Sequence, residues 1–130
     1  MRISSLLYFA AAALSLLGAG AHELIGAPMV LSPLAATDLP QNVIWLHHFS
    51  WHVGTVAVLG MAALYILATR HPAGRLFAMV ATSMSGGFAI LGIGLASFGN
   101  SVLWTTPAPY PWAVVALTGL LGVLLTPRAK

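Results

Sequence analysis

Four apolar runs, separated by links that contain charged residues, glycine or proline, dominate the hydrophobic pattern of the chain. The runs cover residues 3–21, 49–68, 76–98 and 111–126, and the fourth is the shortest. A helix that spans a bilayer needs about 20 mostly apolar residues. Backbone polar groups in lipid must be paired within the segment. The pattern therefore predicts an all-α fold, a four-helix transmembrane bundle that forms a single integral membrane domain over residues 1–130.

The predicted helices cover about residues 3–21, 39–69, 76–98 and 109–126. The link from His22 to Asn42 is the longest and contains Gly26, Pro28 and Pro33, which argue against a continuous helix there. At its end, Asp38 is expected to act as the N-cap of the second helix, with Pro40 in the first turn. That helix would be about 45 Å long, longer than the hydrocarbon core of about 30 Å.

The composition excludes several classes of protein. Of the 130 residues, 59% are hydrophobic and 5% are charged, whereas soluble domains have about 25% charged residues. Disorder requires low hydrophobicity and high charge, so the chain is not disordered. The net charge of +3 comes from scattered basic residues, which does not fit a nucleic-acid-binding surface. We expect the bilayer as the main partner, together with a membrane protein or further copies of the chain.

The placement of charge predicts the orientation. With four spans, one side of the membrane receives every basic residue, namely Arg2, Arg70, Arg75, Arg128 and Lys130. The acidic residues Glu23 and Asp38 fall toward the other side. The positive-inside rule then predicts an up-down-up-down chain with both termini in the cytoplasm. For a bacterial inner membrane, the opposite, histidine-rich face would be periplasmic.

Aromatic and small residues add detail to this picture. The four tryptophans and Tyr110 fall near the outer interface, and we assign Tyr8 and Tyr65 to the inner half of the membrane. The third run carries a stripe of small residues with helical spacing, at Ala81, Ser85, Ala89, Gly92 and Ala96. Such stripes let helices approach closely in lipid. Packing within the chain is the first interpretation, and a homodimer is the second.

Histidines carry the main chemical signal. His48 and His52 share a helix face, and Thr55 extends it one turn deeper. His22 and Glu23 follow the first predicted helix. Because the chain has no cysteine, a metal site would use His48, His52, His22 and Glu23, and imidazole suits Zn, Cu, Fe and Ni. The alternative interpretation is that these are interfacial histidines, with His52 neutral and hydrogen-bonded to a neighbouring helix.

Known catalytic motifs are missing from the sequence. It has no G-x-S-x-G elbow, no H-E-x-x-H motif and no paired carboxylates, which favours a role other than catalysis. Three functions stay open: an accessory or structural subunit of a membrane assembly, a protein that binds a transition metal or haem, and a small oligomeric channel or transporter with His52 as the proton-coupled residue.

Residues 1–21 also match a signal peptide with cleavage after Ala21.

One resemblance accompanies these patterns. His22, Gly26 and the sequence Trp51-His52-x-Gly54-Thr55 are similar to uncharacterised small four-helix proteins of bacterial inner membranes. The likeness covers most of the first two predicted helices. It implies a fold and a location in the inner membrane, and it implies no catalytic role.

Overall fold

The computed structural model describes residues 2–127, and most of them are in helices. The long helices are α1 (Ile3–Ala21), α3 (Gln41–Ala68), α4 (Gly74–Gly94) and α5 (Pro111–Leu125), and the shorter elements are the π-helical turns η1 (His22–Gly26) and η2 (Leu95–Gly99), the helix α2 (Ala27–Ala35) and the 3₁₀ segment η3 (Ser101–Thr105). The predicted all-α four-helix bundle is confirmed.

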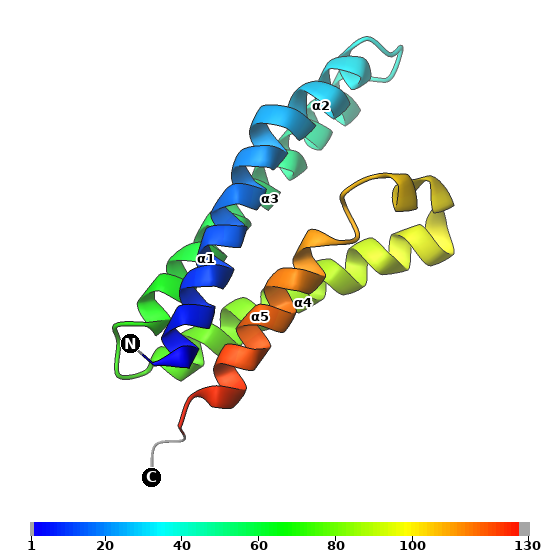
Figure 1. The fold of residues 1–130 in the computed structure, drawn as a ribbon. Helices are drawn as coiled ribbons and strands as arrows, with labels where there is room; N and C mark the ends of the chain where they lie inside the picture. Colours follow the sequence, from blue (N-terminus) through cyan, green and yellow to red (C-terminus); the bar gives the residue numbers. More distant parts are fainter. Residues whose placement is uncertain (1, 128–130) are drawn as a thin grey trace.

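Two helix pairs form the bundle. α1 packs along α3, and α4 packs along α5, while contacts of α1 with α5 and of α3 with α4 join the pairs. Figure 1 shows that the pairs meet at the end that holds both termini and diverge toward the end that holds α2 and η3. Successive long helices run in opposite directions, as the up-down-up-down prediction requires.

Among residues 2–127, three helical stretches are long and apolar enough to cross a membrane, namely Ile3–Ala35, Gln41–Ala68 and Gly74–Gly99. The fourth, α5, is apolar but has 15 residues, which corresponds to about 22 Å. The chain is an integral membrane protein by this criterion. Arg2, Arg70 and Arg75 lie near the end that holds the termini, whereas the predicted positions of Arg128 and Lys130 fall outside the described residues.

The expected break after His22 is wrong, because the helix continues to Ala35. At η1 the backbone widens into a π turn, in which the Ala27 N–H donates to the His22 carbonyl oxygen five residues earlier. Pro28 follows as the second residue of α2, so the hydrogen bond that it cannot donate and the space that its ring needs fall directly after this widened turn. Pro33 lies two residues before the end of α2, so its missing N–H affects only the last turn of the helix.

The expected capping role of Asp38 is also wrong. α3 begins at Gln41, its N-cap residue is Pro40, and no side chain caps it. Pro40 has extended backbone, and its carbonyl oxygen accepts hydrogen bonds from the N–H groups of Val43 and Ile44 at 2.9 and 3.2 Å. Asp38 is therefore an exposed residue of the turn between α2 and α3.

Two tyrosines and two glycines make the centre of the core. Tyr8 and Tyr65 are 2% and 0% exposed, so both rings lie inside the bundle and not on its lipid-facing surface. Each ring occupies space that a glycine of α5 leaves open: a Cβ at Gly122 would lie 2.5 Å from Tyr8, and a Cβ at Gly119 would overlap the Tyr65 hydroxyl. Buried tyrosine hydroxyls need hydrogen-bond partners; that of Tyr8 pairs with Thr126 at 2.7 Å.

Small residues of α4 face the inside of the bundle. Ala81, Ser85, Ala89 and, in η2, Ala96 are buried within the chain. Ser85 lies close enough to Tyr65 for a hydrogen bond of 3.3 Å. Gly92 faces the segment before α5, since a Cβ there would lie 3.1 Å from the Ala108 carbonyl oxygen. The small-residue stripe therefore serves packing within the chain, the first of its two interpretations.

The fit between Tyr65 and α5 gives a stability prediction. Gly119→Ala places a methyl group where the Tyr65 hydroxyl lies, and we expect a loss of about 1–3 kcal/mol in unfolding free energy, as is usual for overpacking. Gly60→Ala is the matched control, because nothing lies within 4 Å of the added Cβ. Unfolding in detergent, followed by circular dichroism, measures both. Equal stability of the two variants would contradict this packing.

Candidate functional site

Polar side chains from η1 and α3 meet on one side of the α1–α3 pair. His22 and Glu23 come from the π turn, and His52 and Thr55 come from successive turns of α3. We call these four residues the Glu23 cluster. About 28 Å of helix separates Ile3 from this level, which is close to the thickness of the hydrocarbon core.

One carboxylate oxygen lies at the centre of the cluster. Glu23 Oε1 accepts a short hydrogen bond from the Thr55 hydroxyl, and it lies 3.1 Å from His52 Nδ1 and 3.7 Å from His22 Nδ1. His22 Nδ1 is 2.9 Å from Thr55 Oγ1. The side chains of His22 and Glu23 are about one-third exposed, and that of His52 is about half exposed. The site is therefore open to small molecules and protons.

These distances determine which nitrogen of each imidazole carries a proton. An ionised carboxylate can only accept hydrogen bonds, so His52 donates its Nδ1–H to Glu23. The Thr55 hydroxyl has one hydrogen and gives it to Glu23, so His22 must donate its Nδ1–H to Thr55 Oγ1. In the neutral form of each ring, Nε2 is then unprotonated and carries a free lone pair. Glu23 thus orients His52 directly and His22 through Thr55.

Trp51 fixes the position of His22. The two rings stack with their centroids 4.0 Å apart and an angle of 12° between their planes. Gly26 makes room for the indole, because a Cβ there would lie 3.0 Å from Trp51 Cζ2. Trp51 Nε1 is buried and has no hydrogen-bond partner among the described residues. It is an unpaired donor beside the cluster.

The structure brings together three of the four predicted metal ligands. His22, Glu23 and His52 converge, whereas His48 lies one turn further out, with its ring 6.5 Å from that of His52 and 5.1 Å from that of Trp45. Within residues 2–127, no group of three or more His, Asp or Glu side chains is arranged to hold a metal ion. The Nδ1 atoms that converge are engaged by Glu23 and Thr55. Metal or haem binding stays a prediction.

Sequence reasoning missed two members of the site. Trp51 was counted as an interfacial aromatic residue, and Gly26 as a helix breaker, yet they form the support of His22. The signal that could have found them is the motif itself: its residues His22, Gly26, Trp51, His52, Gly54 and Thr55 all lie in or against the cluster. Gly54 belongs to this set because a Cβ there would lie 3.9 Å from the His22 ring.

Loss of the carboxylate should loosen the outer part of the α1–α3 pair. In Glu23→Ala, His52 and Thr55 lose their acceptor, which costs about 1 kcal/mol for a partly exposed group. We expect about fivefold faster amide hydrogen exchange in residues 22–27 and 50–56. Asp38→Ala removes the other acidic side chain, which is exposed and distant in sequence from the cluster, and should leave these rates unchanged. Equal rates in the parent and Glu23→Ala would refute the organising role of Glu23.

Comparison of the chain with protein-family models, with curated proteins and with solved structures finds no match. The resemblance to small four-helix inner-membrane proteins therefore stays a prediction.

Proposed function

We propose that the chain is an accessory subunit of a bacterial inner-membrane assembly, and that its outer end docks on a partner membrane protein. The orientation we propose has both termini in the cytoplasm and the Glu23 cluster on the periplasmic side. It is supported by Arg2, Arg70 and Arg75, which lie toward the end that holds the termini, as the positive-inside rule expects of a cytoplasmic end.

The observation that carries this proposal is the length of the first two helical stretches. Residues Ile3–Ala35 form 33 residues of helix and α3 has 28, which correspond to about 50 and 42 Å. A tilt of about 20° shortens them to about 47 and 39 Å, still longer than a hydrocarbon core of about 30 Å. We call α2 and residues 41–48 the outer extension, since this part exceeds the core.

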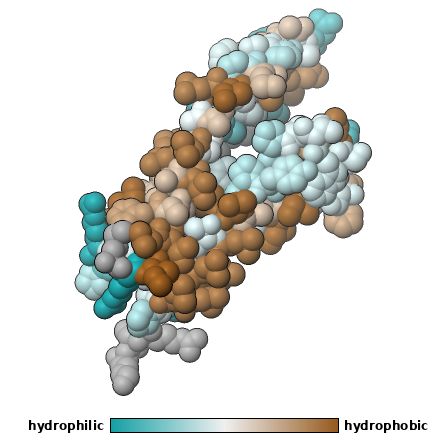
Figure 2. Space-filling model, viewed as in Figure 1, coloured by the Kyte–Doolittle hydropathy of each residue, from teal (hydrophilic) through white to brown (hydrophobic). Residues whose placement is uncertain are grey.

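The surface of the outer extension is apolar. Met29 of α2 is 71% exposed, and Trp45 and Leu46 of α3 are each 66% exposed. Figure 2 shows hydrophobic surface over much of the four helices and again on the upper segment that holds α2, between more polar patches. Lipid tails cover such side chains inside the hydrocarbon core, but beyond it large exposed apolar side chains are typical of protein interfaces. A partner protein at this level would bury them.

The Glu23 cluster has a supporting role in this proposal. It ties η1 to α3 at the point where the outer extension begins. Because the second helix pair has diverged at this level (Figure 1), α1–η1–α2 and α3 support each other there. A rigid outer extension loses less entropy on binding a partner.

Site-specific photo-crosslinking in cells tests the proposal. A benzophenone side chain at Leu46, in the outer extension, should form an adduct with one defined membrane protein. The same side chain at Leu59, which is 47% exposed in the middle of α3, should react with lipid. Trp45→Ala should lower the yield of the Leu46 adduct, because aromatic side chains contribute most at interfaces. Adducts with lipid alone, or with a second copy of the chain alone, would contradict the proposal.

A further inference from the structure

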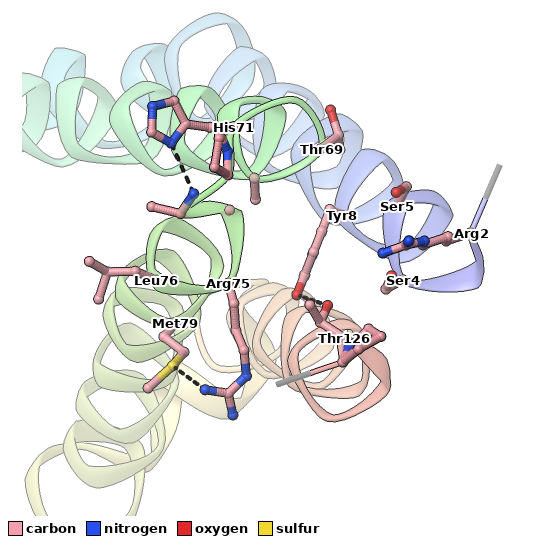
Figure 3. Close-up of a pocket in the computed structure, with 15 residues that line it drawn as sticks. Arg2, Ser4, Ser5, Tyr8, Thr69, His71, Arg75, Leu76, Met79 and Thr126 are labelled. Carbon is pink, nitrogen blue, oxygen red and sulfur yellow. Dashed lines mark hydrogen bonds between the residues drawn. The ribbon is translucent and has the colours of Figure 1, made fainter. Parts of the chain in front are cut away.

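A cavity of about 940 Å³ opens at the end of the bundle opposite to the Glu23 cluster. It lies where α1 begins, α3 turns into α4, and α5 ends. Its polar lining is made of two arginines, one histidine and five hydroxyl side chains, namely Arg2, Arg75, His71, Ser4, Ser5, Tyr8, Thr69 and Thr126. Figure 3 shows Arg2, which precedes α1, and Arg75 of α4 on either side of the hydrogen-bonded pair Tyr8–Thr126.

Within the described part of the chain, Arg75 has no anionic partner in this cavity. Its Nε is buried and has no hydrogen-bond partner among residues 2–127, and its Nη1 donates to the Met79 sulfur at 3.4 Å, which is a weak acceptor. The two acidic side chains of the whole sequence, Glu23 and Asp38, belong to the other end of the helices. A half-buried guanidinium with an unused donor indicates a site for an external anion.

The turn between α3 and α4 holds Arg75 in place. A Cβ at Gly74 would overlap the Ala68 carbonyl oxygen, so the turn closes tightly against the end of α3. The Gly74 N–H donates to the His71 carbonyl oxygen at 2.9 Å, and the Ala73 N–H donates to His71 Nδ1 at 3.1 Å. The backbone of Arg75 is therefore fixed before an anion binds, which lowers the entropy cost of binding.

The shape and chemistry of the cavity favour a phosphate that carries an apolar group. Guanidinium groups bind phosphate oxygens through paired hydrogen bonds. Leu76 and Met79 line the same cavity and are 58% and 41% exposed, so an acyl chain could leave the cavity along apolar side chains. Basic pockets between transmembrane helices are known binding places for anionic lipid head groups.

We propose that this cavity binds the phosphate of an anionic phospholipid. Arg2 and Arg75 pair with the phosphate oxygens, the hydroxyl groups of Ser4 and Ser5 face the rest of the head group, and the acyl chains run past Leu76.

The test is a titration of the full chain, purified in a mild neutral detergent, with phosphatidylglycerol, followed by native mass spectrometry. Arg75→Gln should weaken binding at least about fivefold, the ratio that corresponds to ~1 kcal/mol for a basic residue near an anionic lipid. Arg70→Gln is the matched control: it makes the same charge change five residues earlier, in the turn before α4, but Arg70 is exposed and does not line the cavity. It should bind phosphatidylglycerol like the parent. Arg2→Gln, at an exposed position, provides a second test if Arg75→Gln does not fold.

Three results would overturn the proposal. Equal binding of phosphatidylglycerol and zwitterionic phosphatidylcholine by the parent would remove the preference for an anionic lipid. Inorganic phosphate that competes at the same concentration as phosphatidylglycerol would identify a free anion as the ligand. Equal losses in Arg70→Gln and in the cavity variants would show that net charge, and not the cavity, determines binding.

Discussion

A single carboxylate, Glu23, organises the outer half of the molecule. The two helix pairs pack together at the end that holds the termini and diverge toward the other end (Figure 1), so at the level of His22 the α1–α3 pair has lost much of its support from α4 and α5. At that level Glu23 Oε1 accepts hydrogen bonds from the Thr55 hydroxyl and from His52 Nδ1. Polar contacts of this kind between helices are valuable in lipid, where the hydrophobic effect does not drive helices together.

The two ends of the bundle are built on different physical principles. At the end that holds the termini, Tyr8 and Tyr65 fill spaces left by glycines of α5, so that end depends on close packing. At the outer end, the Glu23 cluster depends on hydrogen bonds between partly exposed groups. Packing fixes geometry through volume, whereas the cluster fixes it through donors and acceptors, and its two free Nε2 atoms stay available for other chemistry.

Sequence patterns predicted the four helices well, because twenty apolar residues in succession leave few alternatives. They failed where the outcome depends on contacts between helices. Sequence patterns assign Tyr8 and Tyr65 to the inner half of the membrane, but one sequence alone does not reveal that their rings pack against Gly122 and Gly119, more than fifty positions further along the chain.

The continuation of the helix through η1 was missed for a related reason. Gly26 and Pro28 are ordinary signals of a break, but a π turn accommodates both without ending the helix. A π turn adds one residue to the turn, so it rotates the next helical residues relative to their positions in a regular α-helix. Whether His22 faces α3 depends on the rotation of one helix against the other, which hydropathy does not encode. The meeting of Glu23 with His52 was therefore one hypothesis of the sequence analysis, and the helix rotation that decides it could not be predicted.

The most direct test of the central claim is the protonation of the two imidazoles in the Glu23 cluster. Nitrogen-15 NMR of histidine-labelled protein in lipid nanodiscs, assigned with His22→Gln and His52→Gln variants, distinguishes Nδ1–H from Nε2–H rings. With both imidazoles neutral, Nδ1–H in His22 and His52 is the expected result, since both rings donate through Nδ1. Nε2–H in both rings, the tautomer that neutral imidazole favours in water, would contradict the organisation of this site by Glu23.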